Sequence, residues 1–355
     1  MKKSGVKHLK SFNGYKNYKE KAILPSVKLI QSKMLIEIIA ALLLGCIMGT
    51  FTGLIPGIHI NLIGVFIVTL STSFLAFLNP IYLVVFISSM AITHTFLDFI
   101  PSIFLGCPDT DTELSILPGH KLLKKGLGYE AVILTAYGSL AAIFILIPIT
   151  IPSTYIISKT FTLIQSLIPY ILIIISAILI STEKNKLTAL GVFILTGFLG
   201  LSVLNLPDNL VNHPLLPLLT GLFGSSMLII SIKNKNQIPP QKLTKPNLKY
   251  KIAKPLLGAL IASPLCSFLP GLGSGQAAII GNTLTNKKSN IKDFLILLGA
   301  TNTFVMGFSF ISLYTISKTR TGAAVAIKDI TGNLAPNTFI LILFIIFISG
   351  LISFF

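Results

Sequence analysis

Charged side chains are scarce in this sequence. Asp, Glu, Lys and Arg make up only 11% of its 355 residues, whereas 53% are hydrophobic and the mean hydropathy is +0.85. A soluble core does not need so much apolar material, and runs of about twenty apolar residues recur along the chain. Alternation over segments of about ten residues, which is typical of membrane β-strands, is missing. The sequence therefore predicts an all-α, polytopic integral membrane protein.

Cysteine and catalytic motifs are equally sparse. Cys46, Cys107 and Cys266 lie in apolar surroundings without a paired spacing, so we interpret them as packing residues rather than as a disulfide framework or a metal site. The sequence contains no Walker loop, no G-x-S-x-G and no H-E-x-x-H motif. Nothing supports ATP hydrolysis or proteolysis, and we expect no enzyme, no catalytic residue, no metal site and no cofactor beyond a coupling ion.

Acidic residues number only eleven against 28 basic ones, of which Arg320 is the single arginine, and the formal net charge is +17. Residues 1–33 hold nine lysines and residues 233–254 hold seven. Because lysine-rich loops face the cytoplasm, we expect a cytoplasmic N-terminus in the cell membrane, with both segments near anionic lipid head groups. Nucleic acid is disfavoured as a partner, since neither segment has aromatic residues spaced for base stacking.

The lysine-rich linker separates two similar halves. GTFTGLIPGIHIN (49–61) in the first half corresponds to CSFLPGLGSGQAA (266–278) in the second. We predict about nine to eleven transmembrane helices and two internal repeats, each with a Pro-Gly broken helix and a re-entrant-like hairpin. Inverted repeats are usual in transporters, whereas lysines before both copies favour one orientation, so the orientation stays open. The predicted organisation is a cytoplasmic segment 1–33, a first repeat 34–151 with an acidic hairpin 98–120, connecting transmembrane helices 152–232, the linker 233–254 and a second repeat 255–355.

The Pro-Gly pairs predict two breaks in apolar helices. Proline removes a backbone donor, and glycine tolerates left-handed backbone angles. The helix after each break begins with N–H groups and a positive end that suit an anion. Alternatively, these are tight helix–helix turns in which small residues serve packing. The candidate substrate-binding residues at the breaks are Pro56, Gly57, His59, Asn61, Pro270, Gly271, Gly273, Gly275 and Gln276.

The stretch 95–126 holds four of the eleven acids between apolar arms broken by proline and glycine. Carboxylates at membrane depth are costly, so they normally face a cavity or a partner and mark a pathway. The candidate ion-coupling residues are Asp98, Asp109, Asp111 and Glu113, as oxygen ligands or as a proton relay. The alternative is a water-exposed hairpin tip in which Asp109 or Thr110 forms a capping box with Glu113.

Two further polar residues interrupt the apolar second half. Arg320 can grip a carboxylate or phosphate with two parallel hydrogen bonds, or it snorkels to the interface. Asn302 lies in the middle of an apolar run and is either a link between helices or a substrate ligand. His94 and His120 can titrate, although a lone membrane histidine is more often a hydrogen-bonded packing residue.

With these motifs, residues 34–355 resemble the TctA family, the membrane subunit of tripartite tricarboxylate transporters. GLIPGIHIN and FLPGLGSGQAA match the G-x-x-P-G motif that the family carries early in each half. PSIFLGCPDTDTELSILPGHKLLKKGLGYEAV matches its first-half hairpin in order and spacing.

The sequence also departs from the family pattern. Pro108-Asp109 stands where the family has Pro-Gly, GATNT (299–303) replaces P-E-x-x-N-N, and SKTRTG (317–322) replaces the second-half hairpin motif. The chain is also shorter than is typical. These departures indicate a compact, divergent prokaryotic branch, which could be archaeal.

The resemblance implies a secondary active transporter for a small organic anion, such as a carboxylate, coupled to Na⁺ or H⁺. The alternatives are a translocase for a polyprenyl-phosphate type of anionic lipid, and a non-transporting scaffold or intramembrane enzyme. The expected partners are the lipid bilayer, the anion and a second copy of the chain in a homodimer. The solute-binding protein and small membrane subunit of typical members do not follow from this sequence.

Overall fold

The computed structural model describes residues 33–73, 75–107, 111–207, 238–244, 252–269, 272–285 and 290–355, and a few isolated residues between 218 and 246. The regular structure in these ranges is helical, which confirms the all-α prediction. Residues 1–32 of the lysine-rich segment and residues 234–237, 245 and 247–251 of the linker lie outside the described residues. The three cysteines are buried free thiols, as expected of packing residues.

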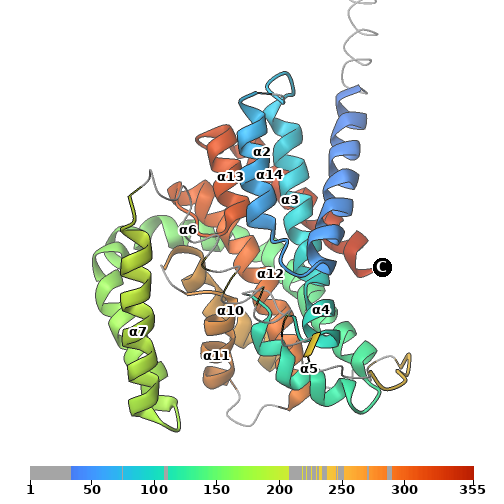
Figure 1. The fold of residues 1–355 in the computed structure, drawn as a ribbon. Helices are drawn as coiled ribbons and strands as arrows, with labels where there is room; N and C mark the ends of the chain where they lie inside the picture. The colour runs from blue at the N-terminus through green and yellow to red at the C-terminus, as the bar shows by residue number, and fades with distance from the viewer. Residues whose placement is uncertain are drawn as a thin grey trace, which may run out of the picture.

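The described helices follow one another along two halves of the chain (Figure 1). The first half contains the helix Lys33–Leu54, α2 (Ile60–Ser71), α3 (Pro80–Leu97), α4 (Phe99–Phe104), the 3₁₀ turn η1 (Glu113–Ser115), α5 (Ile116–Leu123), α6 (Gly128–Thr182) and α7 (Lys186–Leu204). The second half contains α10 (Ala253–Phe268), α11 (Ser274–Thr285), α12 (Ile291–Ile316), α13 (Gly322–Thr331) and α14 (Pro336–Phe354).

Six of the helices in the described residues are long and apolar enough to cross a membrane, fewer than the nine to eleven crossings expected. One reason is that the breaks leave short helices: α2 and α11 have 12 residues each, or about 18 Å, against a hydrocarbon core of about 30 Å. Another is that α6, a single helix of 55 residues, runs across the boundary predicted between the first repeat 34–151 and the connecting helices 152–232. The protein is therefore a multi-pass helical membrane protein with several interrupted segments.

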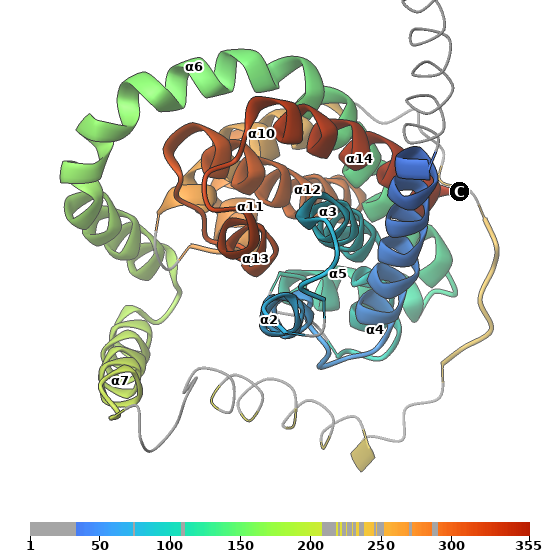
Figure 2. The same ribbon diagram turned by 90° about the horizontal axis from the view of Figure 1, so that it is seen from above.

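Helix α6 bends around the bundle and leads to an outlying helix (Figure 2). Pro148, Pro152 and Pro169 lie inside α6, where each removes a backbone donor and favours curvature. No residue of α7 is buried, although the helix is strongly apolar. An exposed apolar helix of this kind suits a lipid environment.

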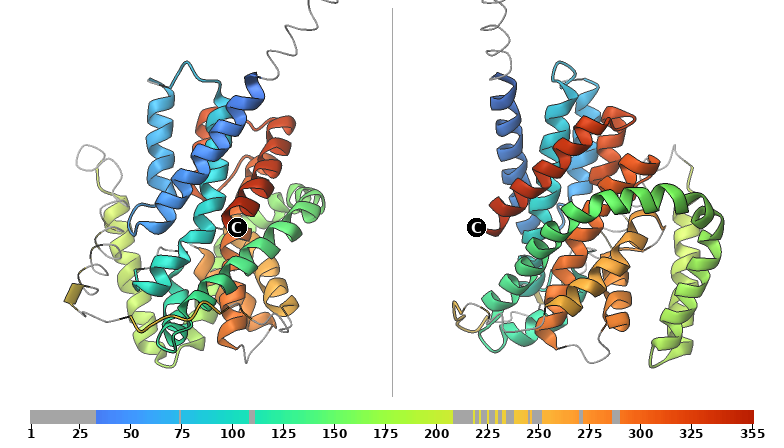
Figure 3. Two further views of the ribbon diagram at one scale, coloured as in Figure 1. Left: turned by 90° about the vertical axis from the view of Figure 1, so that its right-hand side faces the viewer. Right: turned by 180° about the vertical axis from the view of Figure 1, so that it is seen from behind.

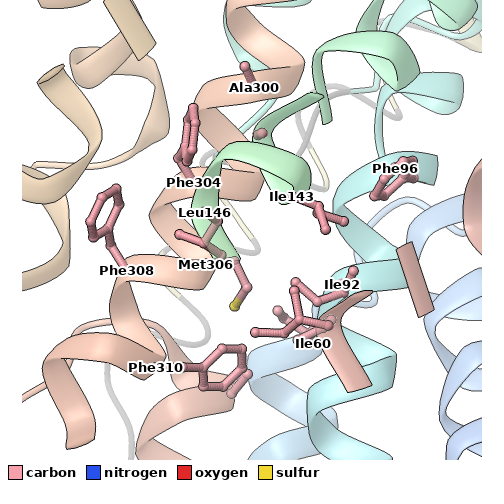
Figure 4. Close-up of a cluster of buried hydrophobic side chains, with 14 of the residues drawn as sticks. Ile60, Ile92, Phe96, Ile143, Leu146, Ala300, Phe304, Met306, Phe308 and Phe310 are labelled. Carbon is pink, nitrogen blue, oxygen red and sulfur yellow. The ribbon is translucent and has the colours of Figure 1, made fainter. Parts of the chain in front are cut away.

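Helix α12 forms the centre of the bundle. Every residue from Leu295 to Leu313 is buried, as expected of a helix that is apolar on all sides. Figure 4 shows the phenylalanines of α12 beside Ile143 and Leu146 of α6 and Ile92 of α3. The helix Lys33–Leu54 lies outside this core, where it packs against α3 and α14 (Figure 3). The core therefore joins both halves of the chain.

The two helices that follow the Pro-Gly pairs run in opposite directions. In Figure 1, α2 rises to the turn that joins it to α3 at the top of the molecule, whereas α11 descends to the bottom. Helices of one half also pack on helices of the other. In this structure α3 of the first half packs on α14 of the second, and α12 of the second half packs on α6 of the first. The starts of α2 and α11 therefore point in opposite directions (Figure 1), whereas the lysines before both predicted copies favour one orientation.

Close packing of α6 on α12 depends on glycine. A Cβ atom at Gly299 would collide with the backbone of Thr135, and the Ser139 hydroxyl already donates to the Gly299 carbonyl at 3.0 Å. We expect Gly299→Val to destabilise the protein by about 1–3 kcal/mol, because the two backbones must separate. Thermal unfolding in detergent measures this effect. Gly191→Val on α7 is the matched control, since a Cβ there meets nothing within 4 Å, and equal losses in both variants would contradict the argument.

Candidate functional site

The first break is built as a capped helix start. The helix Lys33–Leu54 ends, Gly57 follows Pro56 with a φ of +89°, and α2 begins at Ile60. His59 is the N-cap of α2, because its Nδ1 accepts a hydrogen bond of 3.0 Å from the backbone N–H of Asn61. One N–H group that was expected to face an anion is therefore already bound by the protein.

Asn61 connects this break to the second half of the chain. Its Oδ1 accepts a 3.0 Å hydrogen bond from the backbone N–H of Gly322, the first residue of α13. The side chain therefore occupies the positive end of a helix in the other half. Sequence reasoning placed Asn61 on the substrate, whereas in this structure it binds backbone.

Arg320 lies just before that helix start and is exposed. It lines a pocket of about 370 Å³ together with Lys318, Thr319, Val325, Lys328 and Asp329. Three cations face one carboxylate in this pocket, so its charge favours an anion. The pocket does not include the broken helix starts, and Arg320 is thus separate from most of the predicted substrate residues.

The second break receives a carboxylate from the acidic hairpin. Asp111 Oδ1 accepts a 3.4 Å hydrogen bond from the backbone N–H of Ser274, the first residue of α11. The side chain of Gln276 caps the same turn by accepting from the N–H of Gly273 at 2.9 Å. A carboxylate is favourable at a helix N-terminus, where the N–H groups and the helix dipole attract negative charge. Pro270 and Gly271 lie outside the described residues.

Glu113 lies against the same helix start. Its Oε1 would be 3.1 Å from a Cβ atom at Gly275, so the missing side chain of that glycine makes room for the carboxyl group. Glu113 is in η1, between the candidate membrane-spanning helices. Its pKa is raised above the ordinary value, mainly by burial and to a smaller extent by the negative charge of Asp111. Asp109 lies outside the described residues.

Asp98 belongs to a buried polar cluster between α3 and α12. It is 2% exposed, and its Oδ2 accepts a 2.7 Å hydrogen bond from Asn302 Nδ2. His94 Nε2 lies 3.9 Å from the same oxygen, and His94 Nδ1 lies 3.1 Å from the hydroxyl of Thr52. Buried charges persist only where such partners surround them. Asn302, expected as either a link or a substrate ligand, thus links two helices.

Two histidines join the buried cluster to the acidic hairpin. The rings of His59 and His94 meet edge to face with centroids 5.3 Å apart. His59 Nε2 lies 3.9 Å from Asp111 Oδ2. The structure therefore brings Asp111, His59, His94 and Asp98 into one continuous series. Within the described residues, no group of three His, Cys, Asp or Glu side chains is placed to hold a metal ion.

Sequence reasoning missed the role of His94, although a usable signal was present. His94 and Asp98 are four residues apart, which places both on one face of α3. Ser274 was not singled out either. Its N–H donates to Asp111, and its hydroxyl is buried without a hydrogen-bond partner in the part of the chain that is described.

Interrupted helices whose ends meet charged side chains inside an apolar bundle are typical of secondary transporters. The comparisons with known proteins agree with that class. Residues 39–355 match the family model described as "Tripartite tricarboxylate transporter TctA family", and the chain belongs to this family. This match confirms the family resemblance of the sequence motifs. It also identifies the chain as a component of a tricarboxylate-type transporter.

An archaeal protein is among the relatives of this chain. An uncharacterized protein of Methanocaldococcus jannaschii is 36% identical over 316 residues, which cover 88% of this chain and 77% of the relative. This relationship is consistent with the archaeal branch that the shortened motifs suggest. No solved structure matches the chain.

Proposed function

We propose that this protein is the permease of a secondary active transport system for small carboxylate anions. The observation that carries the proposal is the placement of Asp111 at the start of α11. The protein holds a carboxylate of its own at a broken helix end, and the same N–H groups suit the carboxylate of a substrate. Family membership supports the same chemical class.

The proposed anion site contains the start of α11 and the residues around it. Ser274 contributes a buried hydroxyl and an N–H donor, and the carboxyl group of Glu113 lies against Gly275. The starts of α2 and α13 form a second pair of helix ends, which the hydrogen bond between Asn61 and Gly322 joins. This pair faces the opposite direction from the start of α11 (Figure 1). Opposed helix starts of this kind fit alternating access, in which one half of the chain moves against the other.

Ion coupling completes the proposal. The series from Asp111 to Asp98 contains two carboxylates and two histidines, which can exchange protons or attract a cation. We place the protein in the plasma membrane with a cytoplasmic N-terminus. A homodimer, a solute-binding protein and a small membrane subunit are the proposed partners.

A ligand screen by thermal unfolding tests the function. We expect citrate or succinate to stabilise the purified chain, by about 2.7 kcal/mol at a hundredfold excess over the dissociation constant. Inorganic phosphate and a polyprenyl phosphate complete the screen. Stabilisation by the lipid alone would favour a lipid translocase, and no response to any carboxylate would overturn the proposal.

The basic pocket on α13 offers a separate prediction. If Arg320 contacts the anion, Arg320→Ala should raise the dissociation constant for citrate about 10- to 100-fold, because a hydrogen bond to a charged group contributes about 1.5–3 kcal/mol. Calorimetric titration measures the change. Arg320→Lys should restore only part of the affinity, since lysine lacks the planar fork. Lys184→Ala, in the exposed turn before α7, is the control, and unchanged affinity in Arg320→Ala would leave this pocket outside the transport path.

A further inference from the structure

His59 makes two contacts that depend on its protonation in opposite ways. Its Nδ1 accepts the N–H of Asn61 and must therefore carry no proton, so the neutral ring holds its proton on Nε2. Its Nε2 lies 3.9 Å from Asp111 Oδ2. A second proton would have to add to Nδ1, which would remove the acceptor of the helix cap. The same proton would give the ring a positive charge and strengthen its attraction to Asp111.

Asp111 in turn holds the start of the other broken helix. Its second carboxylate oxygen accepts from the N–H of Ser274 at 3.4 Å, a long hydrogen bond. The carboxylate is thus shared between the helix end of α11 and the ring of His59. A stronger pull from the ring would weaken its hold on α11.

We propose that His59 is a proton-operated switch that opens the carboxylate site at the start of α11. When one proton from water adds to Nδ1, the bond to the Asn61 N–H is lost and the imidazolium pairs with Asp111. The Asp111 carboxylate leaves the N–H of Ser274, which then donates its hydrogen bond to the carboxylate of the substrate. Loss of the proton reverses these steps. This inference rests on the proposed function and names H⁺ as the coupling ion.

The surroundings of His59 determine how the switch responds. Among the described residues, Asp111 from the hairpin and His94 from α3 lie near the ring, while Glu113 lies beyond Asp111 and Asp98 beyond His94. The carboxylates favour a charged ring, whereas a charged His94 at 5.3 Å would oppose it. A charge on one histidine therefore disfavours a charge on the other, and His94, next to Asp98, is the alternative holder of the proton.

Citrate binding measured between pH 5.5 and 8 tests the switch, with calorimetric titration of the purified chain. In the wild type, one linked proton should raise the affinity toward low pH by up to tenfold per pH unit. In His59→Asn the asparagine oxygen still caps α2 but takes no proton, so binding should stay at the weak, high-pH level. His59→Gln serves as a second variant should the first fail to fold.

The controls separate this inference from the proposed function. His120→Asn makes the same change outside the series and should keep the wild-type pH dependence, so that ionisation of citrate itself cancels in the comparison. If His59→Asn bound citrate as tightly as the wild type and with the same pH dependence as His120→Asn, the switch would be overturned. The proposed transport function would not be affected. Affinity that follows Na⁺ and not pH would do the same. No citrate or succinate binding at any pH would overturn the proposed function as well.

Discussion

Asn302→Leu is expected to destabilise the protein by about 1.5–3 kcal/mol, the contribution of a hydrogen bond to a charged group. Leucine has the same branched arrangement of side-chain heavy atoms but no donor, so the Asp98 carboxylate loses its 2.7 Å hydrogen bond in the buried interior. The contact of His94 Nε2 with the carboxylate, at 3.9 Å, is too long to replace that hydrogen bond. Thermal unfolding measures the loss, and substrate uptake should fall with it because the cluster belongs to the proposed coupling path.

A double-mutant cycle shows whether the pair itself causes this loss. Removing one partner leaves a buried charge uncompensated, whereas removing both leaves an apolar contact. We therefore expect Asp98→Leu/Asn302→Leu to be less destabilised than the sum of the single variants, with a coupling energy of about 0.5–3 kcal/mol. Additive losses would show that the two side chains do not interact.

A neighbouring position supplies the matched control. Thr301 is buried next to Asn302, and its hydroxyl has no hydrogen-bond partner in the described part of the chain. Thr301→Val removes that hydroxyl at nearly constant shape, so the change should be close to neutral. A large loss in this variant would mean that α12 tolerates no substitution here and that the Asn302 result reports packing.

Local chemistry explains what the sequence could predict. Proline without an N–H and glycine with a φ of +89° end the first helix before α2, and that consequence is encoded in two adjacent residues. The apolar runs likewise encode the helical membrane class. A polar residue directly before a helix is an N-cap signal, so the capping role of His59 was also accessible from the sequence, although the residue was assigned to the anion.

Contacts between distant segments could not be predicted in the same way. Asp98 and Asn302 are 204 residues apart, and Asp111 and Ser274 are 163 apart. A single sequence carries no record of which broken helix a given carboxylate will meet, because packing of the two halves decides it. The boundary predicted between residues 151 and 152 falls inside α6, because a long apolar helix can bend and continue through Pro148 and Pro152.

Asp111→Asn should separate binding from coupling. The variant keeps a side chain of the same shape at the start of α11 but removes the charge that competes with a substrate carboxylate. Two unit charges about 4 Å apart interact by about 1 kcal/mol in water and by more at lower dielectric. We therefore expect citrate to bind at least about fivefold more tightly, since 1.4 kcal/mol corresponds to tenfold, and we expect this affinity to respond weakly to pH because neutral Asn no longer attracts a charged His59.

Transport should change in the opposite direction. In this variant, anion binding no longer requires a charged carboxylate to leave the start of α11, so substrate binding is no longer coupled to proton binding. Uptake of citrate driven by a pH gradient should therefore fall to background in proteoliposomes. Exchange of external for internal citrate needs no net coupling and should persist. Asp293→Asn, in the first turn of α12, makes the same change away from the site and should leave both activities intact. Weaker citrate binding in Asp111→Asn would instead show that the carboxylate helps to hold the substrate, for instance through a shared cation, and would remove the competition on which the coupling argument depends.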